Sequence, residues 1–220
     1  MAVRPSFELA ETHLQQRCAL MRRAIPTLGP YGLLPATKRA PYESLMRAIA
    51  HQQLNGKAAE TILGRFVGLY AGCTFPTPEQ VLATPRETLR AVGFSEAKVK
   101  ALHDIAVKTL DGTIPTTRLI VKMTDDAIVE RLIAVRGVGR WTVEMLLIFQ
   151  LGRPDVLPVD DFGIRSGFRA LKKRDEMPTP KELAAYGQRW APHRTVAAWY
   201  LWRAADRAKS ESLTAAPNSC

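Results

Sequence analysis

Residues 132–142 read LIAVRGVGRWT, and this stretch decides how we expect the chain to fold. Gly137 and Gly139 flank Val138 between two segments whose apolar residues recur at helical spacing, which predicts a tight corner between two helices. Glycine can adopt positive φ and has no Cβ to shield its N–H. These N–H groups would lie beside the positive end of the second helix, so the corner predicts an anion site, to which Arg140 adds charge. The pattern also fits a plain helix corner that ends on a glycine cap.

Most of the remaining chain also has the spacing of helices. The predicted helical segments are residues 7–24, 42–70 with a break at 54–56, 84–93, 95–110, 124–136, 139–151, 161–171, 180–190 and 193–209. A linker rich in proline and glycine is expected over 26–41, and a disordered tail over 210–220. Only the run VLPV at 156–159 resembles a strand, and its proline favours an extended connection instead. The predicted fold class is therefore all-α.

Composition narrows the classes of protein to which the chain can belong. Its 220 residues are 46% hydrophobic, which allows one large domain or two small lobes. An excess of Lys+Arg 31 over Asp+Glu 21 gives a net charge of +10, which indicates a polyanion partner or a solvated basic surface. Three scattered cysteines and four histidines without ligand spacing predict no metal and no cofactor. We expect a cytoplasmic protein, nucleoid-associated if bacterial, without a membrane partner, because no apolar run is long enough to span a bilayer and no signal peptide is evident.

Two neighbouring acids stand at the start of a predicted helix downstream of the corner. Residues 159–164 read VDDFGI, so Asp160 and Asp161 open the segment 161–171. The dipole and the N–H groups at a helix N-terminus stabilise a carboxylate anion there. Either acid could serve only as a helix cap.

The corner and the acids together resemble a known family. The pattern L-x-x-V-x-G-V-G-x-x-T resembles the helix-hairpin-helix DNA-binding motif, here over about residues 129–151, and VDDFGI resembles the aspartate loop of the endonuclease-III-like DNA glycosylases. The resemblance implies a single domain over 1–220 with two helical lobes and an active-site cleft between them. It assigns catalysis to Asp161 and a supporting or capping role to Asp160. It also implies contacts to the DNA backbone from Gly137, Val138, Gly139, Arg140, Thr142 and Lys57.

One residue of the corner distinguishes branches of this family. Members that also cut the DNA strand carry a nucleophilic lysine immediately before the threonine, and this chain has Trp141 there. The resemblance therefore implies a monofunctional glycosylase. Over about residues 42–207 the chain resembles the AlkA type of 3-methyladenine DNA glycosylase, in a short form without the N-terminal β-rich domain.

This resemblance also implies a pocket and a substrate class. Alkylated bases carry positive charge, which the electron-rich faces of indole rings attract. Trp141 and Trp202 are expected to line an aromatic pocket, with Phe162 and Met145 as further wall residues. The implied activity is hydrolysis of the N-glycosidic bond of 3-methyladenine, and of 7-methylguanine, in double-stranded DNA by a monomer.

A base inside the duplex must be flipped out before it reaches an active site, and a side chain is expected to fill the gap. The resemblance places this gap-filling side chain, the plug, in the turn after the segment that begins at Tyr42, where Gln53 and Leu54 are the two candidates.

Two other functions stay open. One is a glycosylase for uracil or hypoxanthine, and the other is a helix-hairpin-helix protein that binds DNA without catalysis.

Overall fold

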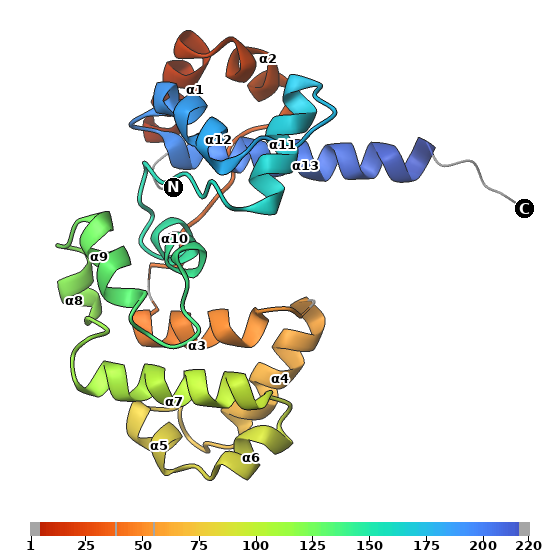
Figure 1. The fold of residues 1–220 in the computed structure, drawn as a ribbon. Helices are drawn as coiled ribbons and strands as arrows, with labels where there is room; N and C mark the ends of the chain where they lie inside the picture. Colours follow the sequence, from red (N-terminus) through yellow and green to blue (C-terminus); the bar gives the residue numbers. More distant parts are fainter. Residues whose placement is uncertain (1–4, 38, 55, 216–220) are drawn as a thin grey trace, which may run out of the picture. The chain divides into compact units, whose positions relative to one another are not determined.

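The computed structural model describes residues 5–37, 39–54 and 56–215 (Figure 1). These residues form the helices α1 to α13 and one short 3-10 helix, with no strand in the described part of the chain. The prediction of an all-α fold is therefore confirmed. None of the helices in these residues is long and apolar enough to cross a membrane.

The chain divides into two compact units. The central unit comprises residues 36–151, and the split unit combines residues 1–35 with residues 152–220. The chain thus enters the split unit, passes through the whole central unit and returns. Each unit has its own buried core.

The central unit contains eight helices among its described residues. They are α3 (Pro41–His51), α4 (Gly56–Gly68), α5 (Pro78–Ala83), α6 (Arg86–Ala91), α7 (Glu96–Leu110), α8 (Thr117–Ile120), α9 (Asp125–Leu132) and α10 (Arg140–Phe149). Helix α7 packs against α3, α5 and α6, and α10 packs against α3 and α9 (Figure 1). The fully buried Leu45, Ile49, Leu102 and Ile105 supply apolar surface from α3 and α7. Burial of these side chains positions the corner between α9 and α10.

Local signals set where several of these helices begin. Thr77 forms a capping box with Gln80 ahead of α5, and Ser95 accepts the N–H of Lys98 at the start of α7. Thr124 accepts the N–H of Ala127 at the start of α9. Such caps satisfy N–H groups that have no partner within the helix, which is why the starting points near 95 and 124 agree with the sequence pattern.

The split unit is built around the long helix α13 (Arg194–Ala215). The other elements are α1 (Pro5–Arg17), α2 (Ala19–Leu28), α11 (Phe162–Lys172), α12 (Pro180–Gly187) and the 3-10 helix η1 (Gln188–Trp190). Helices α11 and α13 make the most intimate contact, because Gly167 lets the two backbones touch at Leu201. Met21, Trp190 and Tyr200 are fully buried in the core of this unit.

Several predicted boundaries are wrong. The last helix runs to Ala215, so residues 210–215 are helical rather than disordered, and residues 216–220 lie outside the described residues. The linker begins after α2 and not at Pro26, because the buried Ile25 and Leu28 hold the final helical turn around that proline. Helix α9 ends at Leu132, four residues before the predicted end at Arg136.

Candidate functional site

The corner between α9 and α10 is a tight turn that contains two exposed glycines. Gly137 has a φ of +77°, and a Cβ there would lie 3.2 Å from both Ala101 Cβ and Ile49 Cδ1. Gly139 is the N-cap of α10, and nothing lies within 4 Å of the position that its Cβ would take. Both glycines are exposed, and no acceptor within the described residues takes a hydrogen bond from either N–H. The turn therefore presents backbone donors at the positive end of a helix.

Two of the residues predicted to contact phosphate are largely enclosed within the turn. The N–H of Val138 donates to the carbonyl of Val135 at 3.0 Å, so this N–H is already used inside the turn. The side chain of Thr142 is buried, because the residue is only 4% exposed. Both side chains pack beneath the turn, where apolar burial holds the corner together. Arg140 stays largely exposed and pairs with Glu144 at 3.2 Å.

Two polar side chains fix this turn to helices distant in sequence, and a third, that of Lys98, binds the end of α3. Gln52 Nε2 donates to the carbonyl of Gly137 at 3.0 Å, and Asp104 Oδ2 accepts the N–H of Arg136 at 2.7 Å. Lys98 Nζ donates to the carbonyls of Ala50 at 2.8 Å and of Gln52 at 2.9 Å. The end of α3 and the α9–α10 turn are thus linked through Gln52. Nothing in the sequence pattern indicates these partners.

The two candidates for the plug lie next to each other at the end of α3. Gln53 is exposed and has a φ of +57°, a left-handed conformation that costs a non-glycine residue about 1 kcal/mol. Leu54 is 41% exposed, and its N–H donates to the carbonyl of His51 at 3.2 Å. Lys57 is exposed in the first turn of α4. Both candidates are therefore accessible at the surface.

A cavity of about 450 Å³ lies between α3, the turn after it and α10. Its walls are formed by Ala48, His51, Gln52, Gln53, Trp141, Thr142 and Met145. Trp141 and Met145 stand four residues apart on α10 and so share one face of the helix. The structure therefore brings together two of the predicted pocket residues, and Trp141 is 44% exposed there. His51 is oriented by a 2.9 Å hydrogen bond from its Nδ1 to the carbonyl of Arg47, with Glu60 Oε1 3.2 Å from its Nε2.

Asp161 lies in the split unit as the N-cap of α11. Its Oδ1 accepts the N–H of Ile164 at 2.8 Å and the indole Nε1–H of Trp202 at 2.9 Å. The predicted capping role of Asp160 is therefore wrong, because Asp161 itself occupies the cap while Asp160 is exposed. The two donors orient the carboxylate of Asp161, and the helix terminus stabilises its negative charge.

Trp202 is thus placed as a hydrogen-bond donor to Asp161, a role that the sequence pattern does not indicate. Gly163 makes this contact possible, because a Cβ there would lie 2.8 Å from Trp202 Cδ1 and 3.2 Å from Asp161 Oδ1. Phe162, the other predicted wall residue of this unit, is 76% exposed at the first position of α11.

The chain matches the model of one protein family and is similar to several individual proteins. A family model described as the HhH-GPD superfamily base excision DNA repair protein matches residues 46–193. DNA-3-methyladenine glycosylase 1 of Schizosaccharomyces pombe is 42% identical over 199 residues, which cover 90% of this chain and 87% of that protein. The solved structure of the S. pombe 3-methyladenine DNA glycosylase in complex with abasic DNA matches with a TM-score of 0.81 and 42% identity, over 88% of this chain and 95% of that one. A DNA-3-methyladenine glycosidase from Bacillus halodurans matches with a TM-score of 0.80 and 35% identity, over 91% and 90%.

Proposed function

Because this chain belongs to the HhH-GPD superfamily of base excision DNA repair proteins, we propose that it is a DNA glycosylase for alkylated bases. It hydrolyses the N-glycosidic bond of 3-methyladenine, and of 7-methylguanine, in duplex DNA and leaves an abasic site. The observation that carries this proposal is the carboxylate of Asp161, which two donors hold at the start of α11. The chain acts as a monomer on double-stranded DNA.

The proposed chemistry follows from the charge that develops during bond cleavage. Breaking the bond between the base and C1′ leaves positive charge on the deoxyribose. An anion held near C1′ stabilises this charge and can orient or deprotonate the attacking water. The hydrogen bonds from Ile164 and Trp202 keep the carboxyl group of Asp161 in one orientation. This pre-organisation is what makes electrostatic stabilisation effective.

In the proposed complex, residues of the central unit bind the DNA. The N–H groups of Gly137 and Gly139 bind a phosphate, and Arg140 and Lys57 add positive charge. Either Gln53 or Leu54 fills the space left by the flipped base. Neutralising phosphates with basic side chains makes such binding strongly dependent on salt.

Trp141 is proposed to recognise the charge of the damaged base. Trp141→Ala is expected to slow single-turnover release of 3-methyladenine roughly tenfold, because a cation over an indole face is worth on the order of 1 kcal/mol. Excision of neutral hypoxanthine should fall less, and the Kd for undamaged duplex should stay the same.

Phe149→Ala is the matched control for this substitution. Phe149 is an aromatic residue on the same helix with a similar exposure, 43% against 44% for Trp141, and it is not among the residues that line the cavity. This variant should behave like the wild type. Equal losses in both variants, or equal losses on charged and neutral bases, would remove Trp141 from substrate recognition.

The residue type at position 141 also predicts the outcome of borohydride trapping. A Schiff base with C1′ requires a primary amine, which an indole ring does not supply. Incubation with lesion-containing DNA and sodium borohydride should therefore give no covalent complex. A strand-cutting member of the superfamily with a lysine at this position serves as the positive control. A covalent band that forms only with borohydride would contradict the monofunctional assignment.

A panel of duplex oligonucleotides, each with one lesion, tests the proposed function. Methylated purines should be released faster than uracil or hypoxanthine. Uracil release that equals or exceeds release of 3-methyladenine would overturn the substrate class. DNA binding without release of any base would identify a non-enzymatic DNA-binding protein.

A further inference from the structure

We propose that Arg194 and Thr195, at the start of α13, are positioning residues for Asp161. They bind residues 152–160, here called the approach segment, which lead directly into the N-cap of α11. This inference rests on the proposed function of Asp161. It concerns only residues of the split unit.

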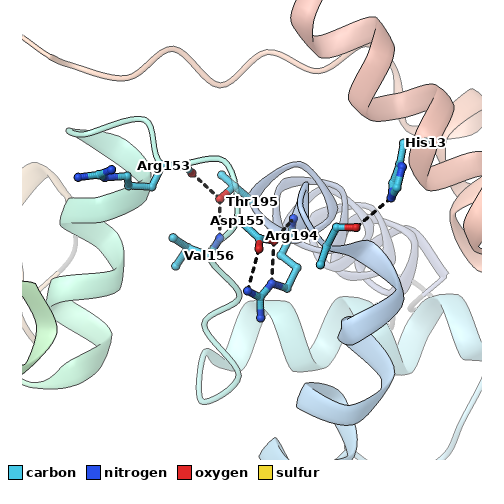
Figure 2. Close-up of polar contacts among 7 residues, drawn as sticks. His13, Arg153, Asp155, Val156, Arg194 and Thr195 are labelled. Carbon is cyan, nitrogen blue, oxygen red and sulfur yellow. Dashed lines mark hydrogen bonds and ion pairs between the residues drawn. The ribbon is translucent and has the colours of Figure 1, made fainter. Parts of the chain in front are cut away.

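Arg194 binds the approach segment through the side chain of Asp155. Asp155 Oδ1 accepts Arg194 Nε at 2.7 Å and the backbone N–H of Arg194 at 3.1 Å, while Oδ2 accepts Nη2 at 2.8 Å (Figure 2). Burial raises the pKa of Asp155, but the hydrogen bonds and the charge of Arg194 outweigh this effect and leave the pKa below its ordinary value. A bidentate ion pair of this kind fixes the relative orientation of the two side chains as well as the distance between them.

Thr195 binds the backbone on both sides of Asp155. Its hydroxyl donates to the carbonyl of Arg153 at 2.6 Å and accepts the N–H of Val156 at 3.0 Å (Figure 2). Its own N–H donates to the carbonyl of Pro154 at 3.0 Å. The residue is only 4% exposed, so these backbone groups would have no ready substitute partner if the hydroxyl were lost.

Asp161, which directly follows the approach segment, is bound to the same helix. Trp202, which donates to Asp161, lies about two turns beyond Thr195, or roughly 10 Å along the axis of α13. The chain between Val156 and Asp161 could extend to about 17 Å, so its covalent connection alone leaves Asp161 free to move by several ångströms. Attachment to α13 at both ends removes this freedom. A displacement of about 1 Å in a reacting group can cost a hundredfold in rate.

The test compares two substitutions of one hydroxyl with a control on the same helix. Thr195→Val keeps the shape of the side chain and removes the hydroxyl, whereas Thr195→Ser retains it. Tyr200→Phe removes a different buried hydroxyl of α13, one that bonds to Glu11 and to the carbonyl of Gly29 rather than to the approach segment. The measurement is single-turnover release of 3-methyladenine at saturating enzyme, alongside the Kd for a duplex with an abasic site.

Thr195→Val is expected to lose about ten- to a hundredfold in rate, with its Kd within threefold of the wild type. Thr195→Ser should recover to within about threefold, and Tyr200→Phe should match the wild type. A second readout is the indole N–H cross-peak of Trp202 in a ¹H–¹⁵N spectrum, assigned with Trp202→Phe. This peak should move in Thr195→Val and stay in place in Thr195→Ser and Tyr200→Phe.

A Thr195→Val variant with the wild-type rate and an unmoved Trp202 peak would overturn the inference, as would an equal loss in Tyr200→Phe. If Thr195→Val does not fold, Asp155→Asn weakens the Arg194 pair from the other side and is judged by the same two readouts. Asp161→Asn distinguishes a failure of the catalytic assignment from a failure of the positioning role. Full activity in that variant would refute the catalytic assignment, whereas an inactive Asp161→Asn beside a fully active Thr195→Val would refute only the positioning role.

Discussion

Asp161→Asn should lose about a thousandfold in the single-turnover rate of 3-methyladenine release and still bind duplex DNA normally. The loss is expected because a neutral amide cannot stabilise the positive charge that develops on the deoxyribose, and removal of one pre-organised electrostatic group costs a factor on the order of 10² to 10³. The rate is measured on methylated DNA with enzyme in excess, and binding is measured on a duplex with an abasic site.

The fold should survive this substitution. Asparagine is as good an N-cap as aspartate, and its amide oxygen can accept the same hydrogen bonds from Ile164 and Trp202 that Oδ1 accepts now. The variant therefore separates the charge of residue 161 from its structural role. An unchanged melting temperature beside a lost activity is the expected pair of results.

Asp160→Asn is the natural control, because it removes the same charge one residue earlier in the chain. Asp160 is exposed and does not cap α11, so most of the activity should remain. If Asp160→Asn loses as much activity as Asp161→Asn, or if Asp161→Asn stays active, the assignment of catalysis to Asp161 is wrong.

Gly167→Ala is expected to reduce the free energy of unfolding by about 3 kcal/mol, at the upper end of what an overfilled core costs. An added Cβ would lie 1.8 Å from the carbonyl oxygen of Leu201 and 2.6 Å from its carbonyl carbon. These are backbone atoms of α13, so the clash cannot be relieved by turning a side chain. The melting temperature should fall by about 10 °C for a chain of this length.

Gly64→Ala makes the same chemical change but is expected to have the opposite effect on the free energy of unfolding. Gly64 lies inside α4, and nothing is within 4 Å of the position of its Cβ. Alanine there should stabilise the chain by about 0.5–1 kcal/mol, because it costs less backbone entropy in a helix than glycine does. Both variants are measured by thermal unfolding of the full chain. Stability losses of equal size in the two would show that contact with Leu201 is not the cause.

The sequence by itself determines the features that depend on residues close together in the chain. The start of α11 at Asp161 follows from a short cap interaction with Ile164, and the common face of Trp141 and Met145 follows from helical periodicity. The turn at Gly137 likewise follows from the need for positive φ. All of these interactions span only a few residues, so composition and spacing carry them.

Only the tertiary structure decides which distant side chains hold these features in place. The indole of Trp202 reaches Asp161 across 41 residues, and the amide of Gln52 reaches Gly137 across 85. The family resemblance implies that Trp202 lines a pocket, and the packing of α11 on α13 at Gly167 brings its indole N–H to the carboxylate of Asp161. Such contacts depend on how helices pack, and helical spacing contains no information about which polar group will meet which. The local pattern therefore places Asp161 and Trp141 on their helices, and the packing of the helices decides which distant side chains hold such residues.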